Sequence, residues 1–544
     1  MKTVRGIGIG SVSAMGKLRF FGRFDNEKRD LSVGTPEQEK RLFSEAAELA
    51  KKQLDGLYTK AKESIGEKEA EIFAIHKMLL EDEEYLETVE SFIFSGQSAA
   101  ASVLSCAEVF ENMFSELDDD YLSARAADIK DVSGRLYRII VGKGAQEETV
   151  SGDPFILVAD DLSPSETLQL DRAKLLGFVT FSGSPNSHTA ILARAMGIPA
   201  VIGTGEISRE LEGKNAIIDS HRGELIIDPD LAALDRYTDE VRRRAQEEQR
   251  LRALIGRESR TKKGKRIKLY ANIGSAEEAE LAYKNDAEGI GLLRSEFLYI
   301  GASEPPDEET QLSFYRAAVE RMHSRPVIIR TLDIGADKNA EYFNIPTEEN
   351  PALGFRAIRF CLENEDIFKT QLRAICRASA KGKVALMLPM VISCSEVRRS
   401  RELLIEVKNE LRYECVDFDE NIPMGIMIET PAAAMMSEEL ARYCDFFSVG
   451  TNDLIQYTLA ADRQNPRLSK LCEENLEPVF RLIEKAVKNA HKAGIWIGVC
   501  GELASRPEYI EKLLKMGIDE LSVSPQAVLS VREKIIEYEG DHNE

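Results

Sequence analysis

The C-terminal half of the chain alternates short apolar stretches with longer helical patterns. From Arg266 onward, eight such apolar stretches occur within about 280 residues. They read RIKLYANI, GIGLL, VIIRTL, VALMLPM, GIMIE, FFSVG, WIGVC and ELSVS. Each is followed by a loop and a helical pattern, and eight βα units of this length are typical of a (β/α)8 barrel. The sequence therefore predicts a TIM-type barrel over residues 263–544.

Polar side chains gather where these predicted strands end, and in such barrels the active site forms at the C-terminal strand ends. The residues at these ends are Asn272, Arg294, Glu296, Arg330, Asp333, Glu429, Asn452, Asp453, Arg463 and Cys500. Arginine offers planar bidentate donors to carboxylate and phosphate, and two carboxylates beside a phosphate suit Mg²⁺. Any one of these residues alone is better explained as a surface ion pair. Their shared position predicts a site for a small, highly anionic phosphorylated acid with Mg²⁺.

The N-terminal half has two textures. Residues 144–229 contain short strand-like stretches, FILVA, GFVTF, AVIG, NAIIDS and ELIID, which predict a small α/β domain. The glycine-rich residues 1–20 are also strand-like and are expected to join it. Residues 21–143 are helical, with few Pro or Gly, and therefore form a predicted insertion. Residues 230–262 are charged and helical without a strong apolar face, which predicts a linker helix.

Composition excludes several classes of protein. The net charge of −22 argues against nucleic acid as a partner. No apolar run approaches the roughly 20 residues that a membrane helix needs, so membrane insertion is not expected. The N-terminus lacks the apolar core of a signal peptide, and the eight scattered cysteines suit reduced thiols, so a cytoplasmic protein is expected. Acidic clusters at 81–90 and 116–122 fit either a solvated helix face or a docking surface for a basic protein.

His188 is one of six histidines and lies where a loop meets a helical run. A helix N-terminus offers free N–H groups and a positive dipole end, which suit a phosphate group. A neutral imidazole is also a good nucleophile at neutral pH. A capping or buried histidine fits the same position, so this stretch alone leaves the role of His188 open. Cys500 is likewise either an inert buried thiol or a proton donor at the barrel mouth.

Several longer motifs carry a resemblance that covers nearly the whole chain. They are IFAIHKMLLEDEEY, AADIKDVSGRLYR, LSPSETLQL, SHTAILARAMGIPAVIGTG, GIGLLRSEFLY, IIRTLDIGADK, ENPALGFRAIR, IETPAAA, FFSVGTNDLIQYTLAADR and GVCGELA. With these motifs the chain resembles the Enzyme I family of the bacterial phosphoenolpyruvate:sugar phosphotransferase system. The resemblance implies a multidomain α/β protein. A swivelling phosphohistidine domain (1–20 and 144–229) holds an inserted helical domain (21–143), followed by a linker helix (230–262) and a (β/α)8 barrel (263–544).

The resemblance implies a phosphoryl relay. Phosphoenolpyruvate (PEP) binds at the barrel mouth with Mg²⁺, its phosphoryl group passes to His188, and pyruvate leaves. The phosphohistidine then phosphorylates a histidine of the carrier protein HPr, docked on the helical domain, as the first step of sugar uptake. Family members dimerise through the barrel domain, so a homodimer is expected.

The resemblance also assigns roles by position in the motifs. His188 matches the phosphorylated histidine, and Cys500 matches the acid that protonates the enolate carbon. The implied PEP contacts are Arg294, Arg330, Asn452, Asp453 and Arg463. The implied Mg²⁺ ligands are Glu429 and Asp453. One supporting residue is implied: Thr167 orients the histidine, although a threonine at a helix terminus fits the same position. Lys338, in GADKN, fits either a positive charge added at the mouth or an exposed loop lysine.

Two alternatives are weighed against this interpretation. A related swivelling-histidine enzyme of the dikinase or synthase type would need a nucleotide-binding domain. The region before His188 is instead an acidic helical insertion without a Gly-rich phosphate loop. The second alternative is a non-catalytic regulatory paralogue, which the intact set of residues at the barrel strand ends argues against.

Overall fold

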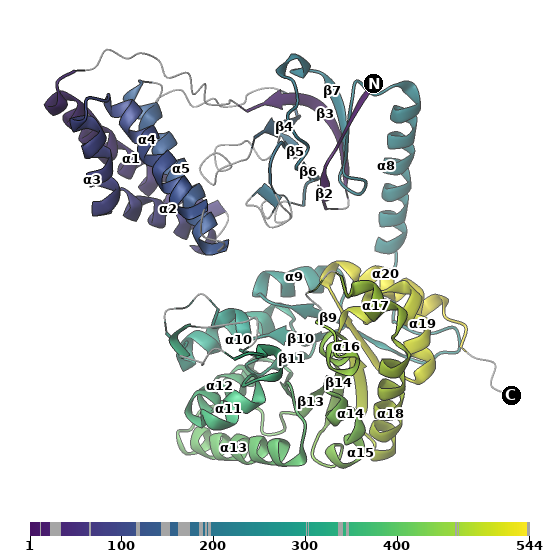
Figure 1. Cartoon of the computed structure of the whole chain (residues 1–544). Helices are drawn as coiled ribbons and strands as arrows, with labels where there is room; N and C mark the ends of the chain where they lie inside the picture. Colours follow the sequence, from purple (N-terminus) through teal and green to yellow (C-terminus); the bar gives the residue numbers. More distant parts are fainter. Residues whose placement is uncertain are drawn as a thin grey trace. The chain divides into compact units, whose positions relative to one another are not determined.

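The computed structural model of the chain describes residues 1–10, 12–21, 34–64, 67–115, 120–142, 153–160, 174–183, 189, 190, 193, 197–300, 302, 304–335, 341–343, 348–462, 465 and 467–540. The chain is divided into two compact units, Met1–Arg244 and Ala245–Glu544 (Figure 1). Within the described ranges, no helix is long and apolar enough to span a bilayer.

The first unit contains a mixed sheet in the strand order β1-β8-β7-β3-β4-β5-β6-β2. Its strands are β1 (Lys2–Arg5), β2 (Ile7–Ile9), β3 (Ser13–Phe20), β4 (Phe155–Ala159), β5 (Leu175–Thr180), β6 (Ala200–Ile202), β7 (Asn215–Asp219) and β8 (Glu224–Ile227). Every residue of β4, FILVA, is buried, as expected for a strand covered on both faces. The N-terminal segment supplies β1–β3, so residues 1–20 share one sheet with the later strands, as predicted.

Helices occupy the chain between β3 and β4. They are α1 (Pro36–Ser64), α2 (Glu67–Leu79), α3 (Glu83–Phe94), α4 (Ala99–Ser115) and α5 (Asp120–Ile140). Their apolar faces form one core that includes Phe43, Phe73, Tyr85 and Val103. Because β3 and β4 are adjacent and parallel, with Lys17 opposite Phe155, the helices are an insertion within the sheet's connectivity.

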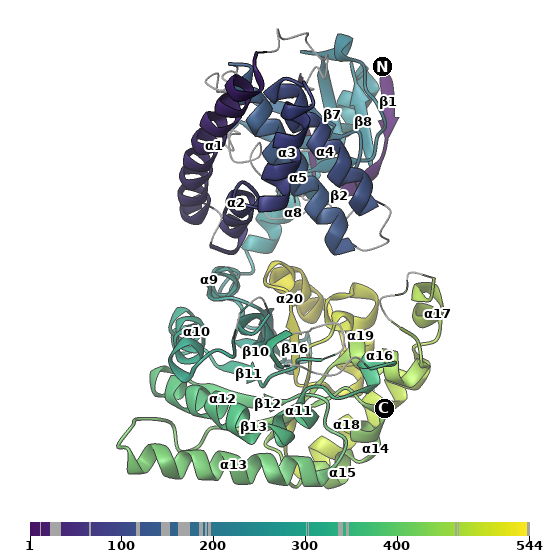
Figure 2. The ribbon, with the colours of Figure 1, turned by 60° about the vertical axis from the view of Figure 1, so that its left-hand side comes forward.

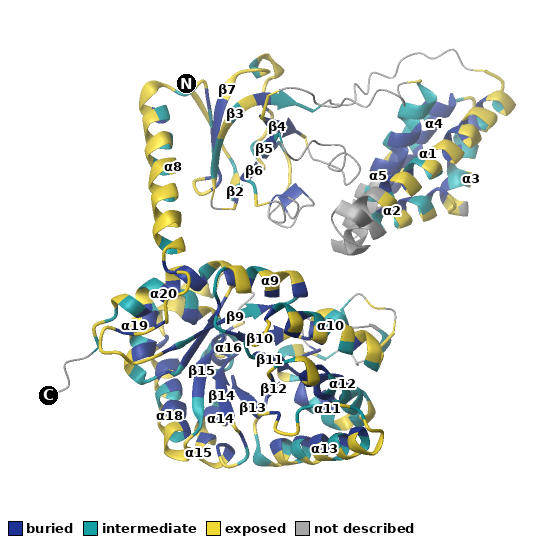
Figure 3. Cartoon of the chain, turned by 180° about the vertical axis from the view of Figure 1, so that it is seen from behind, coloured by how far each residue is buried: buried dark blue, intermediate teal, exposed yellow. Residues whose placement is uncertain are grey.

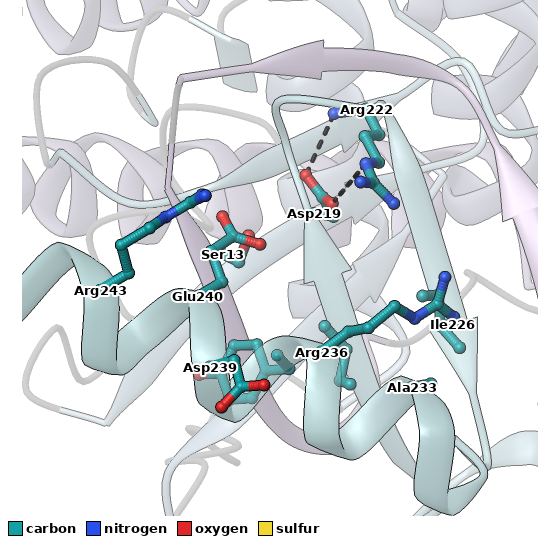
Figure 4. Close-up of a pocket in the computed structure, with 11 residues that line it drawn as sticks. Ser13, Asp219, Arg222, Ile226, Ala233, Arg236, Asp239, Glu240 and Arg243 are labelled. Atoms are coloured by element: carbon teal, nitrogen blue, oxygen red, sulfur yellow. Dashed lines mark hydrogen bonds and ion pairs between the residues drawn. The ribbon is translucent and has the colours of Figure 1, made fainter.

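The predicted linker helix is shorter than expected. Helix α8 (Leu231–Arg252) ends ten residues before Lys262, and the chain turns through Gly256, whose φ of +80° is left-handed. Ala233 is its buried residue, and most of the helix surface is exposed (Figure 3). Where the helix meets the sheet, a cavity of about 290 Å³ lies between it and β3, β7 and β8 (Figure 4). Asp219 and Arg222 pair at the edge of this cavity.

The second unit is a closed parallel barrel, which confirms the predicted fold class. Its strands are β9 (Lys268–Ile273), β10 (Ile290–Arg294), β11 (Val327–Arg330), β12 (Val384–Leu388), β13 (Met424–Ile428), β14 (Phe446–Val449), β15 (Trp496–Val499) and β16 (Glu520–Val523). All eight predicted stretches form these strands, and β16 pairs with β9 to close the circle. Tyr270, Leu292, Met387 and Met427 pack together in the barrel interior, so the barrel is filled by side chains.

Helices surround these strands (Figure 2). They are α9 (Ala276–Lys284), α10 (Glu308–Arg321), α11 (Ile358–Glu363), α12 (Glu365–Ala378), α13 (Cys394–Tyr413), α14 (Pro431–Met435), α15 (Ser437–Leu440), α16 (Thr451–Leu459), α17 (Ser469–Glu474), α18 (Glu477–Ala493), α19 (Pro507–Met516) and α20 (Val528–Glu537). Helix α13 begins with a capping box, in which Ser393 and Glu396 satisfy each other's backbone N–H groups. Such caps fix where the helices start and therefore where the preceding loops lie.

A buried ion pair attaches the segment after α8 to the barrel. Arg532 of α20 is fully buried and donates to the Asp286 carboxylate at 2.6 Å. The same guanidinium donates to the Leu254 carbonyl and the Ser259 hydroxyl, while Asp286 also accepts from the Gly256 N–H. These bonds fix the entry of the chain into the barrel.

Candidate active site

A cavity of about 580 Å³ lies at the C-terminal ends of the barrel strands. Six of the residues predicted from the strand ends line it: Arg294, Glu296, Arg330, Asn452, Asp453 and Cys500. They come from the ends of β10 and β11, from the turn after β10, from the start of α16 after β14 and from the residue after β15, which are far apart in sequence. Parallel strands place their C-terminal ends on one rim, so the fold brings these side chains together.

Arg330 is the most enclosed cation in this cavity. Its guanidinium lies 2.6 Å from the Glu296 carboxylate and 3.1 Å from that of Asp333. Burial lowers the pKa of Arg330, but the charges of Glu296, Asp333 and Glu429 outweigh it and hold the pKa above its ordinary value. The positive charge is therefore permanent, and two carboxylates fix its direction.

Arg356 was missed by the strand-end analysis. It is buried, lies 2.8 Å from Asp333 and 3.7 Å from Asp453, and donates to the Tyr457 hydroxyl at 3.2 Å. Arg356 does not follow a strand. It lies in the loop before α11, where the next residue, Ala357, has a φ of +55°. The one available signal was the position of this arginine in the motif GFRAIRF, whose flanking Phe, Ala and Ile residues are of the types most often buried.

Glu429 directly follows β13, and its carboxylate lies beside Gly450, which lines the cavity. It is 1% exposed, and its Oε1 accepts from the Met390 N–H at 2.6 Å. Burial raises the pKa of Glu429 to about 8, and the neighbouring carboxylates of Asp453 and Asp333 add to this rise. The three carboxylates of Glu429, Asp453 and Asp333 therefore lie in one buried region, together with the guanidinium groups of Arg330 and Arg356.

The arrangement fits a divalent cation. A cation between Glu429 and Asp453 would relieve the repulsion that raises the Glu429 pKa. Gly450 leaves room for it, because a Cβ atom at this position would lie 2.7 Å from Glu429 Oε2. Among the described residues no group of three or more His, Cys, Asp or Glu side chains is placed to hold a metal. Two protein carboxylates suit Mg²⁺, which commonly keeps water and substrate phosphate oxygens as its other ligands.

Asn452 and Cys500 complete the described part of the site. The Asn452 amide donates to the Glu502 carboxylate at 3.0 Å and accepts from the Glu502 N–H at 3.1 Å, which fixes its orientation. Cys500 is 4% exposed, and its Sγ lies 3.6 Å from the Val449 carbonyl oxygen. Burial raises the pKa of the Cys500 thiol to about 12, and the Ser448 hydroxyl opposes this rise. The sulfur therefore carries its proton at neutral pH.

Four predicted site residues lie outside the described residues: His188, Thr167, Lys338 and Arg463. Thr189 and Ala190, which follow His188 directly, are helical and buried. Arg294 is described and lies exposed at the end of β10.

Comparison with protein families agrees with this architecture. Three family models match the chain: the PEP-binding domain of PEP-utilising enzymes over residues 248–539, their N-terminal domain over 2–125 and their mobile domain over 152–223. The fold and the site therefore define a PEP-utilising enzyme, a class that uses a divalent metal.

Curated relatives narrow the class further. The phosphoenolpyruvate-protein phosphotransferase of Priestia megaterium is 39% identical over 98% of this chain and 94% of its own length. That of Bacillus sp. (strain S) is 40% identical over 98% of this chain and 93% of its own. That of Staphylococcus aureus (strain MRSA252) is 39% identical over 94% and 89% respectively. The chain belongs to the phosphoenolpyruvate-protein phosphotransferase family, and it is an enzyme of that class.

Proposed function

We propose that the chain transfers the phosphoryl group of PEP through a phosphohistidine at His188 to a histidine of HPr, releasing pyruvate. This reaction is the first step of phosphotransferase-system sugar uptake. The observation that carries the proposal is the single cavity of about 580 Å³ lined by Arg294, Arg330, Asn452, Asp453 and Cys500. Positive charge, carboxylates, an oriented amide and a protonated thiol in one cavity match what PEP requires.

PEP carries a tetrahedral phosphate group and a planar carboxylate group. Arginine binds the oxygen atoms of both groups well. Arg330 is fixed by Glu296 and Asp333, so it binds without rearrangement. Arg294, Arg463 and the Asn452 amide add donors around the same anion, and Lys338 adds positive charge at the mouth. Glu429 and Asp453 would hold Mg²⁺, which when bound neutralises charge on the phosphoryl oxygens.

The chemical step exchanges one bond to phosphorus for another. A ring nitrogen of His188 forms the N–P bond while the bond from phosphorus to the enolate oxygen breaks. The enolate carbon then takes the proton of the Cys500 S–H group, and the product is pyruvate. Thr167 orients the imidazole so that the attacking nitrogen faces the phosphoryl group.

The proposed acceptor surface is on the inserted helices. Glu81, Asp82, Glu84 and Glu87 are exposed at the start of α3. Such a surface attracts a basic carrier. We further propose a cytoplasmic homodimer that associates through its barrel, with domains bounded at 1–20 with 144–229, 21–143, 230–262 and 263–544.

Transfer of phosphate from labelled PEP to purified HPr tests this function. We expect label on HPr that depends on both this protein and Mg²⁺. Label that appears only when ATP or AMP is supplied would instead favour a dikinase or synthase. No label on HPr under any of these conditions would overturn the proposal.

A further inference from the structure

Glu520 is a buried carboxyl group inside the barrel that the proposed mechanism does not use. Glu520 of β16 pairs with Gly498 of β15, and Gly498 pairs with Ser448 of β14. These three residues therefore form one row across the three strands. Gly498 of β15 and Cys500, the residue after β15, are two residues apart, so they face the same side of the chain. Cys500 packs in the barrel interior with Met427 and Phe446. Glu520 and Cys500 therefore belong to adjacent layers of side chains inside the barrel.

Two glycines make the space that this carboxyl group fills. A Cβ atom at Gly498 would lie 1.7 Å from Glu520 Oε2, and one at Gly291 would lie 2.7 Å from Glu520 Oε1. Either side chain would displace the carboxyl group. Gly498 of β15 and Gly291 of β10 thus leave a space of carboxyl size inside the barrel.

One oxygen of the Glu520 carboxyl group is left without a structural hydrogen bond. Glu520 is 1% exposed, and its Oε1 has no hydrogen-bond partner among the described residues. A buried polar atom without a partner is rare and calls for a functional or solvent explanation. The titratable groups around it are Lys268 and Tyr270 of β9, Cys500 directly after β15, and the adjacent Asp519. Burial raises the pKa of Glu520 well above its ordinary value, although Lys268 opposes the rise, so burial favours the protonated carboxyl group.

We propose that Glu520 returns a proton to Cys500 after the thiol has protonated the enolate carbon. The inference rests on the proposed role of Cys500. In the first step the S–H bond breaks and a C–H bond forms, which leaves pyruvate and a thiolate. In the second step the O–H bond of Glu520 breaks and the S–H bond forms again. The Glu520 carboxylate then regains a proton from water, so each turnover consumes one solvent proton.

The proposal separates two reactions of the barrel. Net turnover to an acceptor leaves a thiolate each time and therefore needs the proton from Glu520. Exchange of labelled pyruvate into PEP does not, because incoming pyruvate gives back to the thiolate the proton that departing pyruvate removed. Loss of Glu520 is thus expected to slow net turnover while exchange continues.

The test compares Glu520→Gln with the unmodified protein in both assays, using Mg²⁺, PEP, ¹⁴C-pyruvate and HPr as acceptor. Glutamine has the size of glutamate and is neutral, so the fold is expected to persist. The matched control is Glu288→Gln, since Glu288 pairs with Arg266 and is not part of the cavity at the mouth. A difference infrared spectrum of the two proteins at neutral pH is expected to show the C=O band of a protonated carboxyl group.

We expect Glu520→Gln to lose net turnover on the order of 10- to 100-fold, at or below the usual contribution of a positioned acid. Exchange is expected to change less than about threefold, and Glu288→Gln is expected to retain both rates. Equal loss of both reactions, or no loss of either, would overturn the relay and leave the proposed function standing. Absence of both reactions in the unmodified protein would overturn the function and the relay together.

Discussion

Arg330 and Glu296 form an ion pair with a nitrogen–oxygen distance of 2.6 Å, in which the side chains are 6% and 2% exposed. Removing only the cation takes one positive charge away from the buried Glu296 and Asp333 carboxylates, while Asp333 keeps its ion pair with Arg356. Arg330→Met is therefore expected to lower the free energy of unfolding by about 3–5 kcal/mol, measured by urea denaturation. Arg412→Met is the control, because Arg412 pairs with Glu420 on the surface and is expected to cost less than about 1 kcal/mol. Equal effects in the two variants would contradict this account of the buried pair.

Glu429 gives the metal-free protein a pH-dependent stability. Its pKa is raised from 4.5 to about 8 by burial and by the Asp453 and Asp333 charges. Between these pH values the folded state holds a proton that the unfolded state has lost. The free energy of unfolding is therefore expected to fall as pH rises through this window and to level off above about pH 8. Urea unfolding in the presence of a chelator measures it.

A divalent cation and the substitution Glu429→Gln are both expected to change the pH-dependent part of the free energy of unfolding that comes from Glu429. The cation binds the ionised carboxylates, so Mg²⁺ is expected to stabilise the protein more at pH 9 than at pH 6. Glu429→Gln has no proton to lose there, so it is expected to weaken both the decline with pH and the stabilisation by Mg²⁺. An unchanged pH profile in this variant would show that another group is responsible.

The cysteines are expected to differ sharply in reactivity. Cys415 is exposed, whereas Cys106, Cys361, Cys376, Cys444 and Cys500 are buried. Burial raises the pKa of Cys376 and Cys444 to about 12, as it does for Cys500. Because the thiolate is the reactive form, iodoacetamide at pH 8 is expected to modify Cys415 and to spare the buried set until the protein is unfolded. Peptide mass spectrometry measures the order, and early modification of Cys500 would contradict its buried position.

The Asp286–Arg532 pair is expected to stabilise the barrel. Burial opposes ionisation of Asp286, but the Gly256 N–H and the Arg532 guanidinium outweigh it and hold the pKa of the carboxyl below its usual value. Its contribution is therefore present above about pH 4 and lost as the pH falls below that value. Arg532→Met is expected to cost about 3–5 kcal/mol at pH 7 by urea denaturation. A cost below about 1 kcal/mol would show that the pair does not stabilise the barrel.

The fold could be predicted largely from short apolar stretches. In the barrel, strands such as VIIRTL and VALMLPM are covered by helices outside and packed side chains inside, so nearly every residue is apolar. The apolar stretches also predict where each strand ends, and therefore predict Arg330, Asn452 and Cys500 as site residues. The C-terminal end of α8 could not be predicted from the sequence. The charged sequence continues past Arg252, and Gly256 is only a weak signal that a helix stops.

Residues away from the strand ends were harder to find. Arg356 reaches the site from a loop, and no local pattern says that such a loop folds inward. Glu520 was missed because the alternation in ELSVS is read as polar outside and apolar inside. In this barrel Leu521 and Val523 pack in the core outside the strands, and Glu520 faces the interior. Only closure of the barrel reverses that assignment.

Phosphorylation of the protein by labelled PEP tests the central claim most directly. The unmodified chain, incubated with Mg²⁺ and labelled PEP without any acceptor, is expected to take up close to one acid-labile phosphate per chain. His188→Ala is expected to take up none while its barrel still binds PEP. Absence of label on the unmodified chain, or full label on His188→Ala, would contradict the account.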